Sequence, residues 1–266
     1  MKSVEDYINL KSVTPNYRLE YGKHPEQFGN LYLPKHGDPY PTIILLHGGC
    51  WRAKFGLSQL GSLCKALTNL GFAVWNMEYR RLGNGGGWPT TFEDVSQGTD
   101  FLATIADKYN LDLSNVTAMG HSAGGHLALW LAGRHHLPSN SKLSINSPIN
   151  ISNVISLAGI PDLVEGVKQN ICLGACQELV GGLPEEVPER YRQASPGNLL
   201  PLNISQWHLV GEQDPIVPVS YIQTYIEKAQ YLDKVHFEII PDIGHFEMVM
   251  PDTASWKYIN IALSNS

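Results

Sequence analysis

Short apolar runs alternate with helix-length amphipathic segments along the chain, and this alternation is the feature that most restricts its fold. Six runs are largely apolar and rich in aliphatic residues: 42–46, 72–77, 116–119, 154–157, 207–210 and 235–240. Runs of this kind are typical of strands that are buried on both faces of a parallel sheet. Helix-length segments lie between and after them: 57–70, 91–109, 125–132, 217–231 and 252–263. The alternation predicts an α/β fold with a doubly wound, mostly parallel sheet.

The domain organisation follows from the length and from one interruption of this pattern. The chain has 266 residues without an internal repeat or a linker, so we expect a single domain over residues 1–266. Residues 160–201 contain no clear strand and are rich in proline and glycine. An insertion after the carboxyl end of a strand lies at the edge of the sheet where ligands bind. We therefore expect a short lid over 160–201, with an ordinary surface excursion as the alternative.

Charge and hydropathy exclude several classes of partner. The net charge is −6, and no run of basic residues is longer than Arg80-Arg81, so a nucleic-acid partner is not expected. No apolar run of 18 residues is present to span a membrane. The first 13 residues include Glu5 and Asp6 and lack the apolar stretch of a signal peptide. These observations predict a cytoplasmic protein without a membrane partner, and they indicate no oligomeric state.

The four cysteines are Cys50, Cys64, Cys172 and Cys176. They are too few and too scattered for a disulfide framework in a chain of this length, so we expect buried or free thiols. Cys172 and Cys176 could share one helix face, and whether they pair with each other is left open. No further ligand with zinc spacing accompanies them, so we expect neither a metal nor a cofactor.

The motif Gly-His-Ser-Ala-Gly at 120–124 fits G-x-S-x-G. It follows the predicted strand at 116–119 and precedes a helical stretch, which is the context that a nucleophile elbow requires. The serine of such an elbow occupies a strained turn, so its neighbours must be small. Ser122 is therefore the candidate nucleophile. His126 lies one helical turn later and either packs beneath the turn or faces the rim of a cleft.

A serine hydroxyl needs a base to take its proton, and the base needs a carboxylate to fix its tautomer. In this architecture the partners follow the serine in the order acid, then histidine, each after a later strand. Asp214 and His245 meet this requirement. Glu212 could replace Asp214 if the loop were shifted, whereas Asp242 shares the loop of His245 and is expected to form a turn. Two further histidines fall inside predicted strands and are expected to pack or to lie half-exposed: His208 and His236.

A glycine-rich loop, His-Gly-Gly-Cys-Trp at 47–51, follows the first apolar run. A tetrahedral intermediate needs backbone N–H groups directed at its oxyanion, and glycine allows the backbone to come close. We expect these donors to be the amides of Gly49, Cys50 and Ala123, so that Cys50 contributes its backbone and not its thiol. A plain turn at the end of a strand is the alternative for this loop.

Together these segments resemble the α/β-hydrolase superfamily, and within it the H-G-G-x-W branch of kynurenine formamidase-like proteins and small carboxylesterases related to hormone-sensitive lipase. The resemblance spans most of the chain and rests on six places: 21–25, 47–51, 78–80, 120–125, Asp214 and His245. It implies Ser122 as nucleophile, His245 as base and Asp214 as the acid that orients the base. Cys50 stands where H-G-G-G lipases have a third glycine, which is compatible with the formamidase-like branch.

The expected function is hydrolysis of a small carboxylic ester or amide through an acyl-enzyme. An arylformamidase that hydrolyses N-formylkynurenine is the first alternative, and a non-catalytic binding module on a hydrolase fold is the second. Trp51, Tyr79 and Trp88 could line a substrate pocket beside the glycine-rich loop at 83–87, or they could pack under the loops. The sequence does not identify the substrate.

Overall fold

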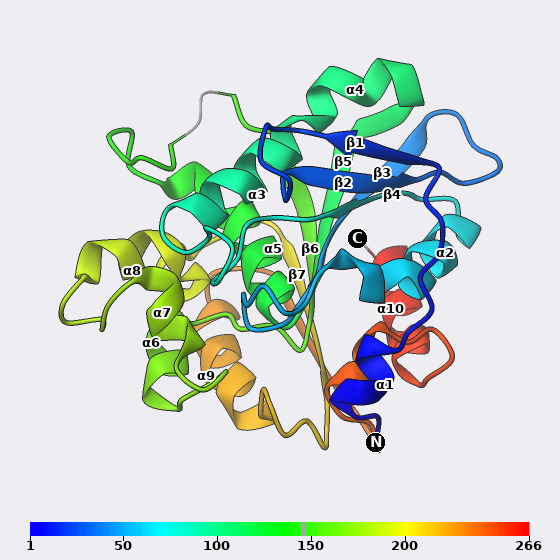
Figure 1. The fold of residues 1–266 in the computed structure, drawn as a ribbon. Coiled ribbons are helices and arrows are strands. Elements are labelled where there is room, and N and C mark those ends of the chain that lie inside the picture. Colours follow the sequence, from blue (N-terminus) through cyan, green and yellow to red (C-terminus); the bar gives the residue numbers. More distant parts are fainter. Residues whose placement is uncertain (145–146, 266) are drawn as a thin grey trace.

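The computed structural model describes residues 1–144 and 147–265, and it contains one eight-stranded sheet (Figure 1). The strands are β1 (Tyr17–Glu20), β2 (Phe28–Tyr32), β3 (Tyr40–Leu46), β4 (Ala73–Met77), β5 (Leu111–His121), β6 (Ile151–Leu157), β7 (Ser205–Gly211) and β8 (Val235–Ile240). Their order in the sheet is β1-β2-β4-β3-β5-β6-β7-β8. Strands β3 to β8 are parallel, whereas β1 and β2 pair antiparallel at one edge. The predicted mostly parallel, doubly wound fold is confirmed, and β1 and β2 are the strands that the sequence pattern missed.

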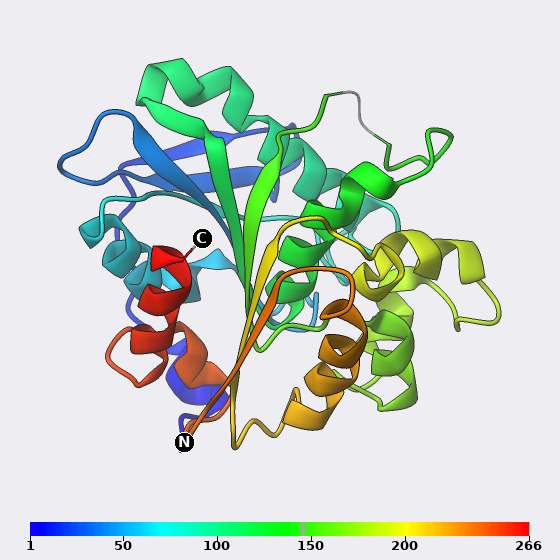
Figure 2. The same ribbon diagram turned by 180° about the vertical axis from the view of Figure 1, so that it is seen from behind.

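Helices cover both faces of the sheet (Figures 1 and 2). Helices α1 (Val4–Ile8), α2 (Gly61–Asn69) and α10 (Ser255–Ser264) lie on one face. The other face carries α3 (Thr90–Asp100), α4 (Leu102–Tyr109), α5 (Ala123–Gly133) and α9 (Val219–Ala229). The segment predicted as one helix at 91–109 is therefore two helices, and the one at 57–70 begins with a 3₁₀ turn, Leu57–Leu60.

Strand β3 shows why the buried runs are apolar throughout. Ile44 and Leu46 point into the core beneath α5, and Ile43 and Leu45 point into the core beneath α2 and α10. Successive side chains of a strand alternate between its two faces, so a sheet covered on both faces buries every residue. Each of these aliphatic side chains contributes about 1.5–3 kcal/mol on burial. The core thus fixes the register of the central strands, and with it the positions of the loops at their carboxyl ends.

The segment between β6 and β7 forms three short helices: α6 (Leu163–Lys168), α7 (Ala175–Val180) and α8 (Pro188–Ala194). They lie together beside α9 at one side of the molecule (Figure 1). We call residues 160–201 the cap segment. None of the described helices is long and apolar enough to cross a membrane.

The cysteines require a correction. Cys50 and Cys172 form a disulfide with a Cα–Cα distance of 5.6 Å, which lies within the usual range for such bonds. The prediction of free thiols is wrong for this pair and right for Cys64 and Cys176, which are free and buried. The two bonded cysteines are 122 residues apart. Only the packing of the cap segment beside the loop after β3 brings them together, so no local pattern reveals the pairing.

Candidate active site

Ser122 lies at the sharp turn between β5 and α5. Its φ of 55° is in the left-handed region, which is strained for a residue with a side chain. The turn is fixed by a hydrogen bond of 2.9 Å from the Ser122 amide to the carbonyl of Leu157 on the neighbouring strand β6. A side chain at Gly124 would collide with the carbonyls of Leu46 and His47, so the helix can approach β3 only with glycine there. The structure thus has the elbow geometry that the motif predicts.

Asp214 and His245 lie on the loops that follow β7 and β8, the next strands along the sheet. Nδ1 of His245 donates a hydrogen bond of 2.6 Å to Oδ2 of Asp214. The other carboxylate oxygen accepts the amides of Ile216 and Val217, each at 2.8 Å. Because the carboxylate only accepts, the proton of a neutral His245 is on Nδ1 and its Nε2 is a free base. The side chains are almost completely buried, which protects the pair from competing water.

The two alternative acids do not take part in this arrangement. Glu212 and Asp242 are both exposed, and Asp242 has a φ of 60°, as expected of a turn residue. Only the carboxylate of Asp214 contacts the His245 ring among the described residues.

His121 connects the elbow to the loop of His245, which the sequence analysis did not predict. Its Nε2 donates a hydrogen bond of 3.0 Å to the His245 carbonyl, and the two ring centroids are 4.6 Å apart. Burial, and the nearby His245, hold the pKa of His121 well below its ordinary value, so the ring is neutral. A Cβ at Gly48 would lie 2.9 Å from Nδ1 of His121 and 3.0 Å from Cβ of Ser122. The nucleophile turn, the glycine-rich loop and the histidine loop therefore meet at one point.

No hydrogen bond joins Ser122 to His245 within the described residues. Such bonds are often long in the absence of substrate and tighten when it binds. Ser122 is 2% exposed and His245 is 4% exposed, so both candidate residues are largely shielded from water.

The glycine-rich loop turns sharply after β3. Gly49, Cys50 and Trp51 have φ values of 110°, 52° and 53°, three left-handed residues in a row. Within the described part of the chain, the amides of Gly49, Cys50 and Ala123 donate no hydrogen bond to another protein group. The Ala123 amide is also the first of helix α5, where the helix dipole favours negative charge. These amides are available to an anionic oxygen.

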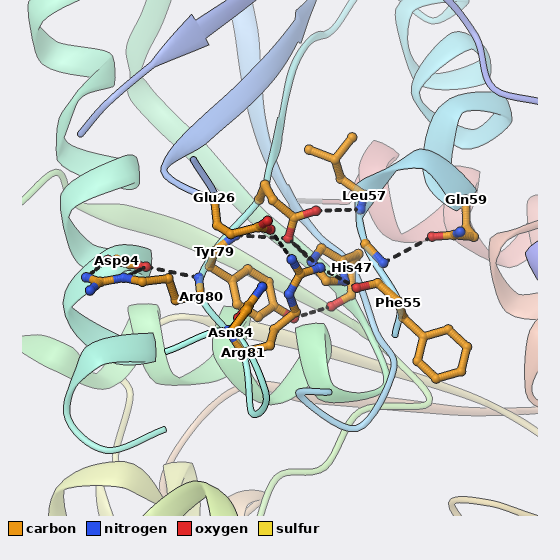
Figure 3. Close-up of polar contacts among 12 residues, drawn as sticks. Glu26, His47, Phe55, Leu57, Gln59, Tyr79, Arg80, Arg81, Asn84 and Asp94 are labelled. Atoms are coloured by element: carbon orange, nitrogen blue, oxygen red, sulfur yellow. Dashed lines mark hydrogen bonds and ion pairs between the residues drawn. The ribbon is translucent and has the colours of Figure 1, made fainter. Parts of the chain in front are cut away.

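A buried polar network supports this loop from beneath (Figure 3). Oε1 of Glu78 accepts from Nε2 of His47 at 2.7 Å and pairs with Arg81 at 2.9 Å, and Oε2 accepts the Leu57 amide at 3.1 Å. Burial raises the pKa of the Glu78 carboxyl, but His47 and Arg81 outweigh burial and hold this pKa below its ordinary value. Glu78 is therefore a carboxylate. Its role was missed because it depends on residues from three separate segments.

His47 itself has an acceptor at each ring nitrogen. Nε2 faces the Glu78 carboxylate at 2.7 Å, and Nδ1 faces the carbonyl of Gly48 at 2.8 Å. Both partners can only accept, so a proton on either ring nitrogen meets an acceptor. The ring also stacks on Tyr79 at 4.4 Å, and the Tyr79 hydroxyl donates to the His47 carbonyl at 2.7 Å.

The aromatic residues expected to line a pocket are mostly packed. Trp51 and Tyr79 have no exposed surface, so the packing alternative fits them better than substrate contact. Trp88 is half-buried, and its amide donates to the Leu179 carbonyl of the cap segment at 2.7 Å. His126 is also buried and meets Trp51 edge-on at 5.2 Å, which decides for packing beneath the turn. Burial lowers the pKa of His126 to about 4.

Parts of two curated proteins are similar to this chain in sequence. The probable isoprenylcysteine alpha-carbonyl methylesterase ICME of Oryza sativa subsp. japonica is 30% identical over 110 residues, which is 41% of this chain and 26% of that protein. Neutral cholesterol ester hydrolase 1 of Rattus norvegicus is 32% identical over 103 residues, which is 37% of this chain and 25% of that protein. The matched region thus spans only about a quarter of each relative.

Solved structures share the fold over nearly the whole chain. Esterase B from Lactobacillus rhamnosis has a TM-score of 0.80 at 18% identity and covers 98% of this chain and 88% of its own. A truncated carbohydrate esterase from gut microbiota has a TM-score of 0.76 at 20% identity and covers 97% of both chains. At these identities the likeness concerns the fold, which is that of the α/β-hydrolases. The BD-FAE family profile matches residues 30–228, which is most of the chain, and this protein therefore belongs to the BD-FAE family.

Proposed function

We propose that this protein is a serine hydrolase that cleaves small carboxylic esters or amides through an acyl-enzyme. Ser122 is the nucleophile, His245 the general base and acid, and Asp214 the residue that orients His245. The single observation that carries the proposal is the buried 2.6 Å hydrogen bond between His245 and Asp214, on the loops beside the elbow of Ser122. The esterase names of the relatives and of the similar structures support the same reaction class.

In the proposed reaction Oγ of Ser122 attacks the carbonyl carbon while its proton moves to Nε2 of His245. The negative charge that develops on the carbonyl oxygen is bound by the amides of Gly49, Cys50 and Ala123. When the intermediate collapses, the bond to the leaving group breaks, and His245 gives its proton to the departing alcohol or amine. Water then attacks the acyl-enzyme while its proton moves to Nε2 of His245. When this second intermediate collapses, His245 gives the proton to Oγ of Ser122, and the carboxylic acid is released.

Esters are the favoured substrates within this class. The esterase names of the similar proteins support esters, whereas an arylformamidase would need a partner for the charged amino-acid tail of N-formylkynurenine, for which the sequence indicates no residue. The non-catalytic alternative is disfavoured because nucleophile, base and acid are all present. We further propose that residues 1–266 act as one domain, that the cap segment covers the substrate, and that Trp88 is the aromatic residue nearest to it.

Location is a separate proposal. The sequence analysis predicts a cytoplasmic protein, whereas a disulfide is typical of oxidising compartments. A cytoplasmic and an oxidising location can be distinguished by the redox state of Cys50 and Cys172. It is measured in protein taken directly from cells under thiol-blocking conditions.

The test is a substrate panel with matched variants. Short-chain p-nitrophenyl esters should be hydrolysed with a higher kcat/KM than N-formylkynurenine, and Ser122→Ala should lower kcat by about 10⁴-fold or more. Asp214→Asn should lower kcat strongly, whereas Asp242→Asn, on the exposed turn beside His245, should change it less than twofold.

A fluorophosphonate probe gives an independent answer, because it should form one adduct, at Ser122. Activity of Ser122→Ala within tenfold of the parent would refute the assignment. Turnover of the formyl substrate alone would favour the arylformamidase, and the absence of both turnover and adduct would favour the binding module.

A further inference from the structure

The Cys50–Cys172 disulfide joins the proposed oxyanion loop to the cap segment. Cys50 supplies one of the three free amides, and its side chain is bonded to the turn between α6 and α7. Cys50 therefore has two roles: its backbone amide is a proposed oxyanion donor, and its sulfur is bonded to the cap segment. In the other loops that carry the proposed catalytic groups, all contacts are noncovalent.

The backbone is strained on both sides of this bond. Cys50 and Trp51 have φ values of 52° and 53°, and Cys172, Leu173 and Gly174 have values of 60°, 52° and 84°. Residues with a side chain seldom adopt this region, and runs of them are rarer still. Such conformations persist only where the surroundings over-determine them. A covalent link between two left-handed turns is a constraint of that kind.

The noncovalent contacts between the same two regions are weaker. Arg52 forms a two-pronged ion pair with Glu178 of α7, at 2.8 Å and 2.9 Å, but both side chains are substantially exposed. Exposed ion pairs contribute little, because water screens them. Within the loop, the Leu82 amide donates to the Trp51 carbonyl at 2.7 Å, and the Arg52 amide donates at 3.0 Å to the Gly49 carbonyl, which belongs to the same peptide group as the Cys50 amide. The disulfide adds a covalent constraint on Cys50 from outside the loop.

From this geometry we infer that Cys172 is a positioning residue for the proposed hydrolysis: through its disulfide it holds the Cys50 amide in the orientation that binds the oxyanion. The inference rests on the proposed function. It also makes the activity sensitive to reduction. A dithiol reductant would attack one sulfur as its thiolate, form a mixed disulfide and then close its own ring. The Cys50–Cys172 bond takes up two electrons and two protons and becomes two thiols, while the dithiol is oxidised. Cys50, which is half-buried, is the more accessible residue of the pair.

The experiment compares Cys172→Ala with Cys176→Ala. Both cysteines are buried in the cap segment four residues apart, but Cys176 is a free thiol. Loss of one oxyanion donor in a hydrolase lowers kcat by about 10²–10³-fold, so loosening one donor should lower it by about tenfold or more. We expect this loss in Cys172→Ala with KM changed less than twofold, and no such loss in Cys176→Ala. A trifluoromethyl ketone, which mimics the tetrahedral intermediate, should bind Cys172→Ala more weakly by the same factor as kcat falls. If Cys172 had only a structural role, Cys172→Ala would lower the unfolding temperature, but the loss of inhibitor affinity would not match the loss of kcat.

Reduction of the folded parent with dithiothreitol covers the case in which the variant does not fold. The parent should lose activity by the same factor, regain it on reoxidation, and show two more thiols after reduction than before when titrated under denaturing conditions. Equal thiol counts before and after reduction, or unchanged kcat in the reduced parent, would overturn the inference. If Ser122→Ala keeps its activity, the proposed function fails. If Ser122→Ala is inactive and reduction has no effect, only the role of Cys172 fails.

Discussion

The nucleophile turn and the glycine-rich loop meet at the same point but are held in different ways. The turn around Ser122 is held by the backbone: the Leu157 carbonyl, the end of β5, and glycines that admit the neighbouring strand. The glycine-rich loop has backbone hydrogen bonds too, but side chains also hold it: those of the Glu78 network and the disulfide to the cap segment. The small residues that the turn needs can be seen in the local sequence, whereas the side-chain partners of the loop come from distant segments. The turn around Ser122 should therefore tolerate no larger side chain, and the glycine-rich loop should tolerate no loss of its charged partners or of its disulfide.

The largest effect should come from filling the space at the turn. Gly124→Val places a side chain against the carbonyl of Leu46, the last residue of the central strand β3, and against that of His47, which follows it, so the backbone there cannot move aside. We expect a loss of more than about 4 kcal/mol in the free energy of unfolding, or no folded protein. Gly71→Ala is the control, because Gly71 has a φ of 97° but open space around it. It should cost about 1 kcal/mol in a urea titration. Equal effects would mean that space at the turn is not limiting.

Removing a charge beneath the loop should have the next largest effect. Glu78→Gln keeps the shape but removes the carboxylate that faces His47, and it leaves Arg81 with Glu26 as its remaining acidic partner. Breaking a buried ion pair costs about 3–5 kcal/mol, and kcat should fall because the loop is no longer supported. Glu227→Gln on the exposed face of α9 should change stability by less than about 0.5 kcal/mol. A similarly small effect at Glu78 would show that the network does not hold the loop.

The free energy of unfolding should depend on pH in a different range for each of the two regions. On the turn side, the pKa of His126 is lowered to about 4 by burial, from an ordinary 6.5. Below pH 6.5 the unfolded chain binds a proton that the folded His126 does not bind, so stability falls as the pH falls towards 4. The loss should reach about 3 kcal/mol at pH 4. On the loop side, the lowered pKa of Glu78 costs stability only below its ordinary value of 4.5.

His126→Gln should therefore make the stability profile less steep between pH 6.5 and 4, and the rest of the fall belongs to the other buried histidines with lowered pKa values, His121 and His208. His36→Gln, at an exposed position, is the matched control and should leave the profile unchanged. The measurement is the urea midpoint at each pH. A profile that falls equally in parent and His126→Gln would contradict the assignment.

The smallest effect should come from the exposed ion pair between the loop and the cap segment. Arg52→Ala removes the contact with Glu178 and should cost about 0.2–1 kcal/mol, with kcat changed less than twofold. Arg192→Ala, which removes a more exposed pair with Glu189 within α8, should have no larger effect. A loss of kcat in Arg52→Ala as large as that in Cys172→Ala would assign the positioning role to the ion pair and not to the disulfide.

This difference between the regions also explains what the sequence predicts. The elbow, the six parallel strands, and the loops of Asp214 and His245 are predictable because each depends on a few consecutive residues. Glu78 and the Cys50–Cys172 pair are not, because their partners are brought together only by the fold. The roles of Trp51 and Tyr79 are ambiguous in the sequence for the same reason. The sequence around an aromatic residue beside a site does not show whether its side chain contacts the ligand or packs in the core. The edge strands β1 and β2 show no apolar run, because β1 is mostly exposed and β2 contains Gly29 and Asn30.

The disulfide also divides the chain topologically. Residues 50–172 form a covalent ring that contains β4, β5 and β6, and therefore Ser122, while Asp214 and His245 lie on the tail that leaves it. A protease cut inside the ring leaves the two fragments joined until they are reduced, whereas a cut between Cys172 and Asp214 separates the nucleophile from its base. Closing a ring of this length also restricts the unfolded chain, by about 5 kcal/mol in the loop-entropy estimate. Oxidised protein should therefore resist proteolytic inactivation far better for cuts between residues 50 and 172 than for cuts between residues 172 and 214.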